Sequence, residues 1–262
     1  MGDSYILRVE LHTTALALGA EGKGLLAADE SKGSIKKRLE KLKKENAEDN
    51  RREWRDVMFT AEGPFEKYIS GKIICQHHQG TGDQTLGIKV DKGTVTLPRT
   101  VPEETTTEGL YGLLERCKQY YERGARFTAV FAVDFAGLVL KASMVVPGDM
   151  SGQKASPEQV AEAAVHVLSK TVPQPVPTIV FLSGGLSDSD SISFLNAINK
   201  RKQSNPPAAL WALTFSFGRA LQGVAMQAWA DGKLKESQSM WVDQAKWSRE
   251  AAAGKYESGC PS

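Results

Sequence analysis

The chain has 262 residues, of which 41 % are hydrophobic and 24 % are charged, with a formal net charge of +2. The apolar fraction excludes a globally disordered chain, and the near-neutral charge argues against binding of nucleic acid through a basic surface. The length suits one α/β barrel domain or two smaller domains, and it can bury a large core without disulfide bonds.

Short apolar runs alternate along the chain with longer helical patterns. We expect strands at 25–28, 68–75, 86–90, 127–133, 135–146, 178–182 and 212–216. We expect helices at 34–57, 107–123, 156–170, 187–200, 220–230 and 235–252. The third helix begins with Ser156, Pro157 and Gln159, which is typical of a capping box.

This alternation predicts a parallel α/β sheet, and the continuous apolar runs indicate strands that are buried on both faces. A closed barrel and an open doubly wound sheet are both possible at this point. No GxGxxG motif follows a strand, which argues against a dinucleotide-binding fold. Because we find no domain boundary, we interpret residues 1–262 as a single domain.

The cysteines and the termini indicate the compartment. Cys75, Cys117 and Cys260 have no paired spacing, as is typical of a reduced compartment. No apolar run reaches the roughly 18–20 residues of a membrane span, and the N-terminus lacks the features of a secretory signal. We therefore expect a cytoplasmic protein with neither a membrane nor a nucleic acid as partner.

Polar residues follow several of the predicted strands. Asp29 ends the first strand, Ser183-Gly184-Gly185 ends a late one, and Gly218-Arg219 ends the last. Ligands bind at this end of parallel α/β folds, and glycines before a helix expose N–H groups to an anion. We therefore favour a phosphate site over the alternative of a tight turn beside a surface arginine.

Two lysines lie within apolar strand sequence, Lys89 in LGIKV and Lys141 in LVLKA. Burial of a lysine lowers its pKa and frees the amine as a nucleophile. A lysine that is salt-bridged or reaches solvent at a strand end is the simpler interpretation for either one alone. Two lysines, an acid and an anion site at one end of a sheet favour Schiff-base chemistry.

Other polar clusters have simpler explanations. Lys36-Lys37-Arg38 and the charged run 41–55 are interpreted as a solvated helix face. His77 and His78 lie in a polar loop, 76–85, without a Cys or third His in metal-ligand spacing. We therefore expect no metal site.

Five motifs, in order along the chain, resemble class I fructose-bisphosphate aldolases, and in particular the plant cytosolic members. The motifs are LLAADES at 25–31, GIKVDKG at 87–93, ETTT at 104–107, FLSGG at 181–185 and ALTFSFGRA at 212–220. The resemblance extends from about Gly19 to about Tyr256 and implies a TIM (β/α)8-type barrel. It also implies cleavage of fructose 1,6-bisphosphate to dihydroxyacetone phosphate and glyceraldehyde 3-phosphate in glycolysis and gluconeogenesis. The family uses a covalent lysine Schiff base, no metal or other cofactor, and a homotetramer.

The resemblance also implies a set of site residues. It places the Schiff-base lysine at Lys141, the aspartate of the first barrel strand at Asp29, and a substrate-contacting lysine at Lys89. Two serines, Ser31 and Ser34, match positions that line one phosphate end. The other phosphate site corresponds to Ser183, Gly184, Gly218 and Arg219.

The chain departs from the family at several places. A family segment is missing near 133–135, and it contains the fifth barrel strand with the glutamate that acts as general acid and base. Ala129 and Ala136 stand where the family has a lysine and another glutamate, and the family's C-terminal tail is cut short at 260–262. Because the join is too short for a crossover, we expect that 127–146 cannot hold two properly connected parallel strands.

These departures predict an incomplete barrel, reduced stability, and weak or absent turnover. Lost general acid and base groups usually cost roughly 10²–10⁴-fold each. The alternative from another class is a non-catalytic aldolase-like protein that binds sugar phosphates or associates with family subunits. A third is a splice or gene-model product without a stable function.

Overall fold

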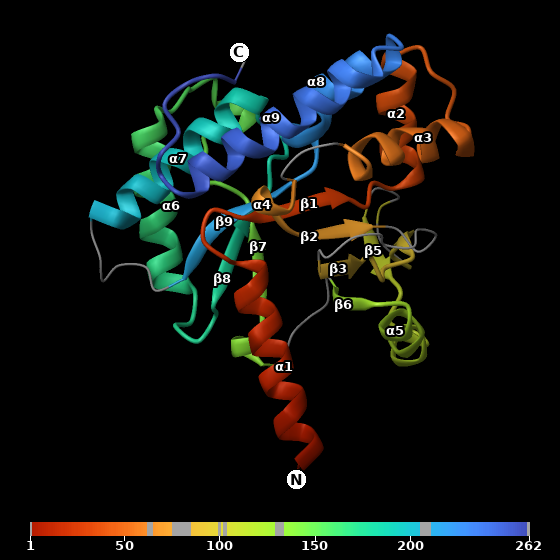
Figure 1. The fold of residues 1–262 in the computed structure, drawn as a ribbon. Coiled ribbons are helices and arrows are strands. Elements are labelled where there is room, and N and C mark those ends of the chain that lie inside the picture. The colour runs from red at the N-terminus through yellow and green to blue at the C-terminus, as the bar shows by residue number, and fades with distance from the viewer. Residues whose placement is uncertain are drawn as a thin grey trace.

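The computed structural model describes residues 2–61, 65–74, 85–98, 101, 104–128, 134–204 and 211–260. Its main element is a seven-stranded parallel sheet with the order β6-β3-β2-β1-β9-β8-β7, curled into an incomplete barrel (Figure 1). The strands are β1 (Gly24–Ala28), β2 (Ile69–Ile74), β3 (Thr85–Ile88), β6 (Ala125–Thr128), β7 (Val139–Ala142), β8 (Thr178–Phe181) and β9 (Ala212–Phe217). The predicted α/β class and incomplete barrel are confirmed.

Both faces of the central strands are covered, which explains their continuous apolar runs. Every residue of β1 and of β8 is buried. Leu26 and Phe181 belong to the large core beneath the outer helices. Leu25 and Val180 belong to a smaller cluster on the opposite face, which is the inside of the curl.

Helices cover the outer face of the sheet. They are α2 (Lys32–Lys41), α3 (Glu48–Phe59), α6 (Pro157–Thr171), α7 (Asp188–Ser204), α8 (Arg219–Ala230) and α9 (Leu234–Ala252). In Figure 1, α8 and α9 lie across the top, α6 and α7 to one side, and α2 and α3 to the other. The capping box predicted for α6 is present, with Ser156 and Gln159 each accepting from the other's backbone N–H. No helix in the described ranges combines the length and apolarity needed to cross a membrane.

The N-terminal helix α1 (Gly2–Leu18), which the sequence analysis did not predict, packs at the amino ends of the strands. The Ser70 hydroxyl donates to the Leu18 carbonyl at 2.6 Å, and the Thr178 hydroxyl donates to the Ala15 carbonyl at 3.1 Å. Leu18 is 1 % exposed within the inner cluster. The amino end of the curl is therefore covered by α1, whose first turns extend away from the sheet (Figure 1).

The expected helix over 34–57 is wrong, because two helices, α2 and α3, occupy this stretch. The chain leaves α2 through Lys43, whose φ of 55° lies in the left-handed region. Its neighbour Lys44 donates to the Leu39 carbonyl at 2.9 Å, as in a helix C-terminal turn. This turn redirects α3, so that Trp54, Val57 and Met58 reach the core.

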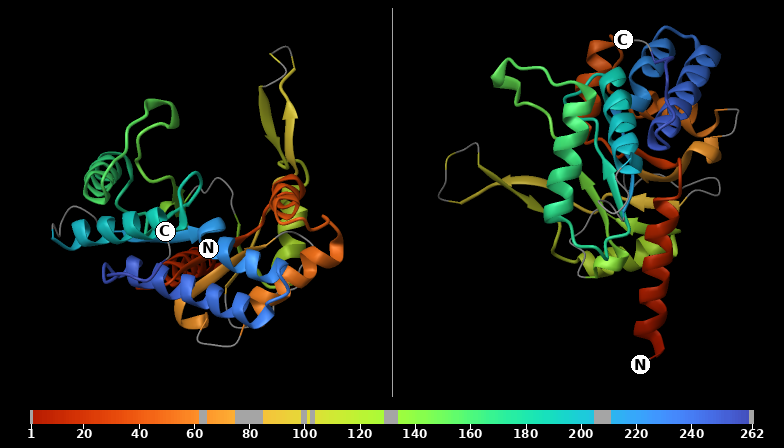
Figure 2. Two further views of the ribbon diagram at one scale, coloured as in Figure 1. Left: turned by 90° about the horizontal axis from the view of Figure 1, so that it is seen from above. Right: turned by 90° about the vertical axis from the view of Figure 1, so that its left-hand side faces the viewer.

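The expected helix over 107–123 is also wrong, because its first part is a strand. β4 (Gly93–Thr96) and β5 (Thr105–Glu108) pair in an antiparallel hairpin that projects from the body (Figure 2). Gly109, with φ of 129°, ends the hairpin, and Gly112, with φ of 65°, precedes α5 (Leu113–Glu122). These two left-handed positions separate strand from helix.

The stretch 127–146 contains two strands of the parallel sheet, so the expectation that it cannot is wrong. β6 and β7 are not neighbours but lie at opposite edges of the sheet, so no crossover to an adjacent position is needed. Between them, a 3-10 helix (Phe135–Gly137) packs on α1, and Arg8 and Asp134 form an ion pair at 3.5 Å. The predicted continuation of the strand through 129–133, with Ala129, lies outside the described residues, as does 75–84 with Cys75, His77 and His78.

Candidate functional site

The predicted site residues lie at or near the carboxyl ends of the parallel strands. Asp29 follows β1, Lys89 follows β3, and Gly218 follows β9. Ser183 and Gly184 come just after β8, and Lys141 is within β7. Because the strands are parallel, all of these residues lie at the same end of the curl, opposite α1.

The alternation of side chains along each strand places three of them on the inner face. Side chains two residues apart on a strand point to the same face. Asp29 is therefore on the same face as Leu25, and Lys141 is on the same face as Val139. Leu25 belongs to the inner cluster and Val139 packs against it. Lys89 is on the same face as Gly87, which pairs across the sheet with Phe127, a residue that packs against the inner cluster. The carboxylate and the two amines therefore face one concave space.

Lys141 is exposed, so the expectation of a buried lysine is wrong. The cause is its strand, because β7 is an edge of the sheet and no strand of the described residues lies beyond it. Within the described ranges, Lys141 makes neither a hydrogen bond nor an ion pair. Its amine is accessible but is not oriented by a neighbour.

Lys89 is partly buried and paired with an acid. Its Nζ lies 3.2 Å from the Asp91 Oδ2, and the two side chains are 30 % and 31 % exposed. Arg116 of α5 donates to the Val90 carbonyl at 2.8 Å and also to the Gly109 carbonyl. These bonds hold the end of β3 against the base of the hairpin, so Lys89 is better positioned than Lys141.

The expected phosphate residues surround the starts of two helices. Ser183 is 4 % exposed, Gly184 is exposed, and the chain then enters α7. Gly218 precedes α8, and a Cβ on it would lie 3.1 Å from the Ala27 carbonyl, so glycine lets the end of β9 approach β1 closely. Arg219 is the exposed first residue of α8. The two helix starts and the guanidinium can receive an anion.

Ser31 and Ser34 lie at the start of α2 and have a structural role there. The Ser31 hydroxyl accepts from the Ser34 N–H at 3.2 Å, as an N-cap does, and the two hydroxyl oxygens lie 3.0 Å apart. Both residues are exposed. The cap orients the two hydroxyls, which remain accessible.

Sequence reasoning missed Arg38. The solvated-face interpretation suits Lys36, which pairs with Glu40 at 3.6 Å, but it is wrong for Arg38, whose side chain is only 20 % exposed. Arg38 donates to Glu30 and to the Gln222 Oε1. Its position three residues after buried Ile35 was an available signal, because residues three apart share a helix face.

The charges near Arg38 come from three elements. Burial lowers the pKa of Arg38, opposed by Glu30, and the nearby positive charge of Arg219 lowers it further. Burial raises the pKa of Asp188, opposed by the charges of Arg219 and Arg38. Two guanidiniums and the two carboxyl groups of Glu30 and Asp188 therefore lie near the carboxyl ends of β1, β8 and β9.

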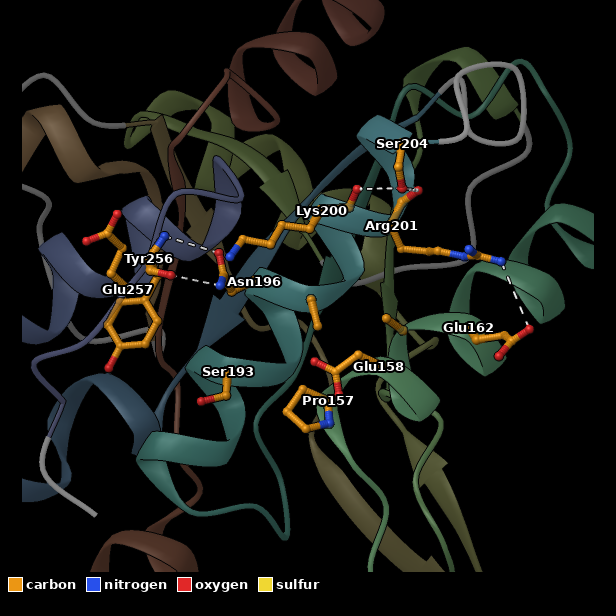
Figure 3. A pocket seen from close by; sticks show the side chains of 12 residues that line it. Pro157, Glu158, Glu162, Ser193, Asn196, Lys200, Arg201, Ser204, Tyr256 and Glu257 are labelled. Carbon is orange, nitrogen blue, oxygen red and sulfur yellow. Dashed lines mark hydrogen bonds and ion pairs between the residues drawn. The ribbon is translucent and has the colours of Figure 1, made fainter.

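A groove of about 620 Å³ lies elsewhere, between α6, α7 and the segment after α9 (Figure 3). None of the predicted site residues lines it. Its wall includes Asn196, which binds the backbone of Tyr256 through two hydrogen bonds. Across the described ranges, no group of three or more His, Cys, Asp or Glu is arranged to hold a metal ion.

Comparison with known proteins gives consistent matches. The family profile described as class-I fructose-bisphosphate aldolase matches residues 10–134 and 129–262. Cytosolic fructose-bisphosphate aldolase 4 of Arabidopsis thaliana is 36 % identical, covering 97 % of this chain and 85 % of that protein. A cytoplasmic fructose-bisphosphate aldolase isozyme of Pisum sativum is 35 % identical, covering 95 % and 92 %.

A solved structure is also similar. It is fructose-bisphosphate aldolase from Plasmodium falciparum in complex with TRAP and a small-molecule inhibitor, with a TM-score of 0.87 and 30 % identity, covering 97 % of this chain and 96 % of that one. The alignment with the Arabidopsis protein spans 341 positions against the 262 residues here, so that protein has residues that this chain lacks. The two profile matches overlap at residues 129–134, next to the position where the family segment is predicted to be missing.

Proposed function

This chain belongs to the class I fructose-bisphosphate aldolase family, and from that premise we propose that it cleaves fructose 1,6-bisphosphate slowly through a Schiff base on Lys141. The observation that supports the site is that Asp29, Lys89 and Lys141 share the inner face of one parallel sheet near its carboxyl end. The relatives are fructose-bisphosphate aldolases by name, and several are cytosolic. We extend that substrate, glycolytic role and compartment to this chain.

The proposed reaction begins at the amine of Lys141. The amine adds to the C2 carbonyl, and loss of water forms an iminium. The Asp29 carboxylate takes the proton of the C4 hydroxyl, the C3–C4 bond breaks, and its electron pair moves into the iminium to give an enamine. Glyceraldehyde 3-phosphate leaves, C3 is protonated, and water hydrolyses the iminium to release dihydroxyacetone phosphate. Lys89, paired with Asp91, stabilises the negative charge of substrate oxygens.

Two anion sites hold the ends of the substrate. We assign one phosphate to Ser183, Gly184, Gly218 and Arg219, where two helices begin and a guanidinium is exposed. The other lies at Ser31 and Ser34, whose hydroxyls are oriented by the cap of α2. Binding at both ends would place the carbonyl carbon against the inner face of the sheet. No metal is needed, because the iminium itself accepts the electrons.

Turnover is slow for a structural reason. Lys141 lies exposed on an edge strand, without an orienting partner in the described ranges. Enzymes gain much of their rate by holding reacting groups in place and excluding water, and an exposed amine loses both effects. Asp29 and Lys89 are also the only proton-handling groups that we assign, so a general acid and base contribution of roughly 10²–10⁴-fold is missing.

Borohydride trapping tests the proposal. The folded protein is incubated with dihydroxyacetone phosphate and sodium borohydride, and the labelled peptide is mapped by mass spectrometry. We expect a reduced adduct on Lys141 that disappears in Lys141→Arg and persists in Lys170→Arg, an exposed lysine on α6. Folded protein without an adduct on Lys141 overturns the Schiff-base assignment. A turnover number within the ordinary enzyme range of about 1–10³ s⁻¹ overturns the claim of slow catalysis.

A further inference from the structure

The parallel sheet has an open edge at β7. Within the described ranges, β7 pairs only with β8. The Ala142 carbonyl accepts from the Leu182 N–H at 2.9 Å, so the main-chain groups of Ala142 point toward β8. Because these groups alternate along a strand, Val139 and Lys141 point their N–H and C=O groups to the open side. An edge of this kind can accept a further strand.

The β4–β5 hairpin has an open edge at β5. All of its strand residues are exposed, and it pairs with no third strand in the described ranges. The Glu104 carbonyl accepts from the Leu97 N–H at 2.9 Å, so the main-chain groups of Glu104 and, by alternation, of Thr106 point toward β4. Those of Thr105 and Thr107 therefore point away from it. A two-stranded hairpin is only marginally stable in water, so a third strand would stabilise it.

The two edges carry opposite charges. Lys141 is exposed on β7, and Glu104 and Glu108 are exposed at the two ends of β5. None of the three forms an ion pair with another described residue. Antiparallel pairing of β7 with its own copy would place two Lys141 side chains opposite or diagonal to each other, and like charges there are destabilising. The charges therefore favour β5 as the partner of β7.

Exposed apolar residues follow both strands. Leu110 and Tyr111, after β5, are 85 % and 96 % exposed. Val145 and Val146, after β7, are 37 % and 38 % exposed. Parallel pairing brings the two pairs to the same end of the contact, whereas antiparallel pairing would separate them. Because exposed apolar groups gathered in one place mark interaction sites, these residues favour the parallel arrangement.

We propose that β5 of a second copy of this chain adds in parallel to the open edge of β7. In a parallel ladder, a residue bonds to the two residues that flank its neighbour on the other strand. Lys141 then lies beside Thr106. Its N–H donates to the Thr105 carbonyl, and its carbonyl accepts from the Thr107 N–H.

This register also matches the charges. Glu104 and Glu108 lie two positions before and after Thr106, on the face that carries Lys141. The pairing is between copies, because in one copy the hairpin follows β3, next to the β6 edge, and projects from the body, while β7 is the opposite edge (Figure 2). It is independent of the proposed function, because main-chain pairing needs no chemistry at the Lys141 amine.

Sedimentation velocity of the full chain over a range of concentrations tests the contact. We expect the mass to rise above that of one chain as the concentration rises, in a dimer with two such contacts or in longer chains of copies. Thr107→Pro removes the donor at the open edge of β5 and should weaken association about tenfold or more. Thr94→Pro is the matched control, because the main chain of Thr94 points away from β5 at the other edge of the hairpin, and it should associate as the wild type does.

Two further variants test the register. Glu104→Lys combined with Glu108→Lys should weaken association about fivefold, and the addition of Lys141→Glu to the same chain should restore it. A Thr106→Cys chain mixed with a Lys141→Cys chain should form a disulfide between copies under mild oxidation, identified by mass spectrometry. A Thr94→Cys chain mixed with the Lys141→Cys chain should not.

A wild-type chain that stays monomeric at every concentration overturns the proposal. Association of folded Thr107→Pro at the strength of Thr94→Pro overturns it too, as does equal cross-linking by Thr94→Cys and Thr106→Cys. A charge-reversal loss that Lys141→Glu does not restore has the same consequence. If Thr107→Pro does not fold, the charge reversal and the cross-link decide.

Discussion

Replacement of Asn196 by leucine should destabilise the protein and release the segment after α9. Asn196 is 9 % exposed, and its side chain donates to the Tyr256 carbonyl at 2.9 Å and accepts from the Tyr256 N–H at 3.1 Å (Figure 3). The Tyr256 hydroxyl in turn accepts from the Cys260 N–H at 3.0 Å. The Asn196 amide therefore ties Tyr256 to α7, and at the start of the segment 253–260 the Gln203 amide of α7 donates to the Ala253 carbonyl at 3.0 Å.

The magnitude follows from the two backbone groups that lose their partners. Leaving a buried donor or acceptor unsatisfied costs about 1–3 kcal/mol, so two cost roughly 2–6 kcal/mol. Because a groove lies beside Asn196, water can reach part of this site, and we expect a loss of about 2–3 kcal/mol. Urea denaturation followed by circular dichroism measures it as a lower midpoint with an unchanged slope.

The matched control is Asn199→Leu on the same helix. Asn199 is 4 % exposed, but among the residues that the structure describes its side chain donates only to the Leu195 carbonyl of its own helix, so we expect a loss below about 1 kcal/mol. Thiol labelling mapped by mass spectrometry adds a local measurement, in which labelling of Cys260 should accelerate in Asn196→Leu while that of Cys117 does not change. Equal destabilisation by the two variants, or unchanged labelling of Cys260, would refute this reasoning.

Two further predictions concern the sheet. Burial lowers the pKa of Lys72, which is 2 % exposed, below its ordinary value of 10.5, so the unfolded chain holds more protons in the pH range just below 10.5. The free energy of unfolding should therefore rise with pH in that range. Urea denaturation at pH 8–10 should show a smaller rise for Lys72→Met and the wild-type rise for the exposed Lys170→Met. If Lys72→Met keeps the wild-type dependence of the free energy of unfolding on pH, Lys72 is not its source. Gly24→Ala should lower the free energy of unfolding by about 1–3 kcal/mol, because the added Cβ would lie 2.5 Å from the buried Phe215 ring. Gly148→Ala, where a Cβ meets nothing within 4 Å, should melt like the wild type, and equal melting of both variants would count against the packing argument.

Elements with a strong local signal could be predicted from the sequence. β1 and β8 appear as continuous apolar runs because both of their faces are buried. α6 begins at its capping box, because that signal depends only on neighbouring residues. The β4–β5 hairpin could not be predicted in this way, because all of its strand residues are exposed and none carries a core pattern.

The candidate site also has residues whose position could be predicted from the sequence and residues whose surroundings could not. Asp29, Lys89 and Gly218 follow strands, and their common edge follows from parallel pairing alone. The exposure of Lys141 depends on β7 lying at an edge, which the apolar run around it does not reveal. The contact between Arg38 and Gln222 joins residues 184 positions apart.

The sequence by itself therefore determined the family, the parallel α/β class and the residues that follow each central strand, because these depend on local motifs and hydrophobic periodicity. Only the tertiary structure decided that β6 and β7 lie at opposite edges, that Lys141 is accessible, and that Arg38 donates to the buried Gln222. The physical reason is that burial and hydrogen-bond partners depend on which distant segments meet, and no local pattern records that choice.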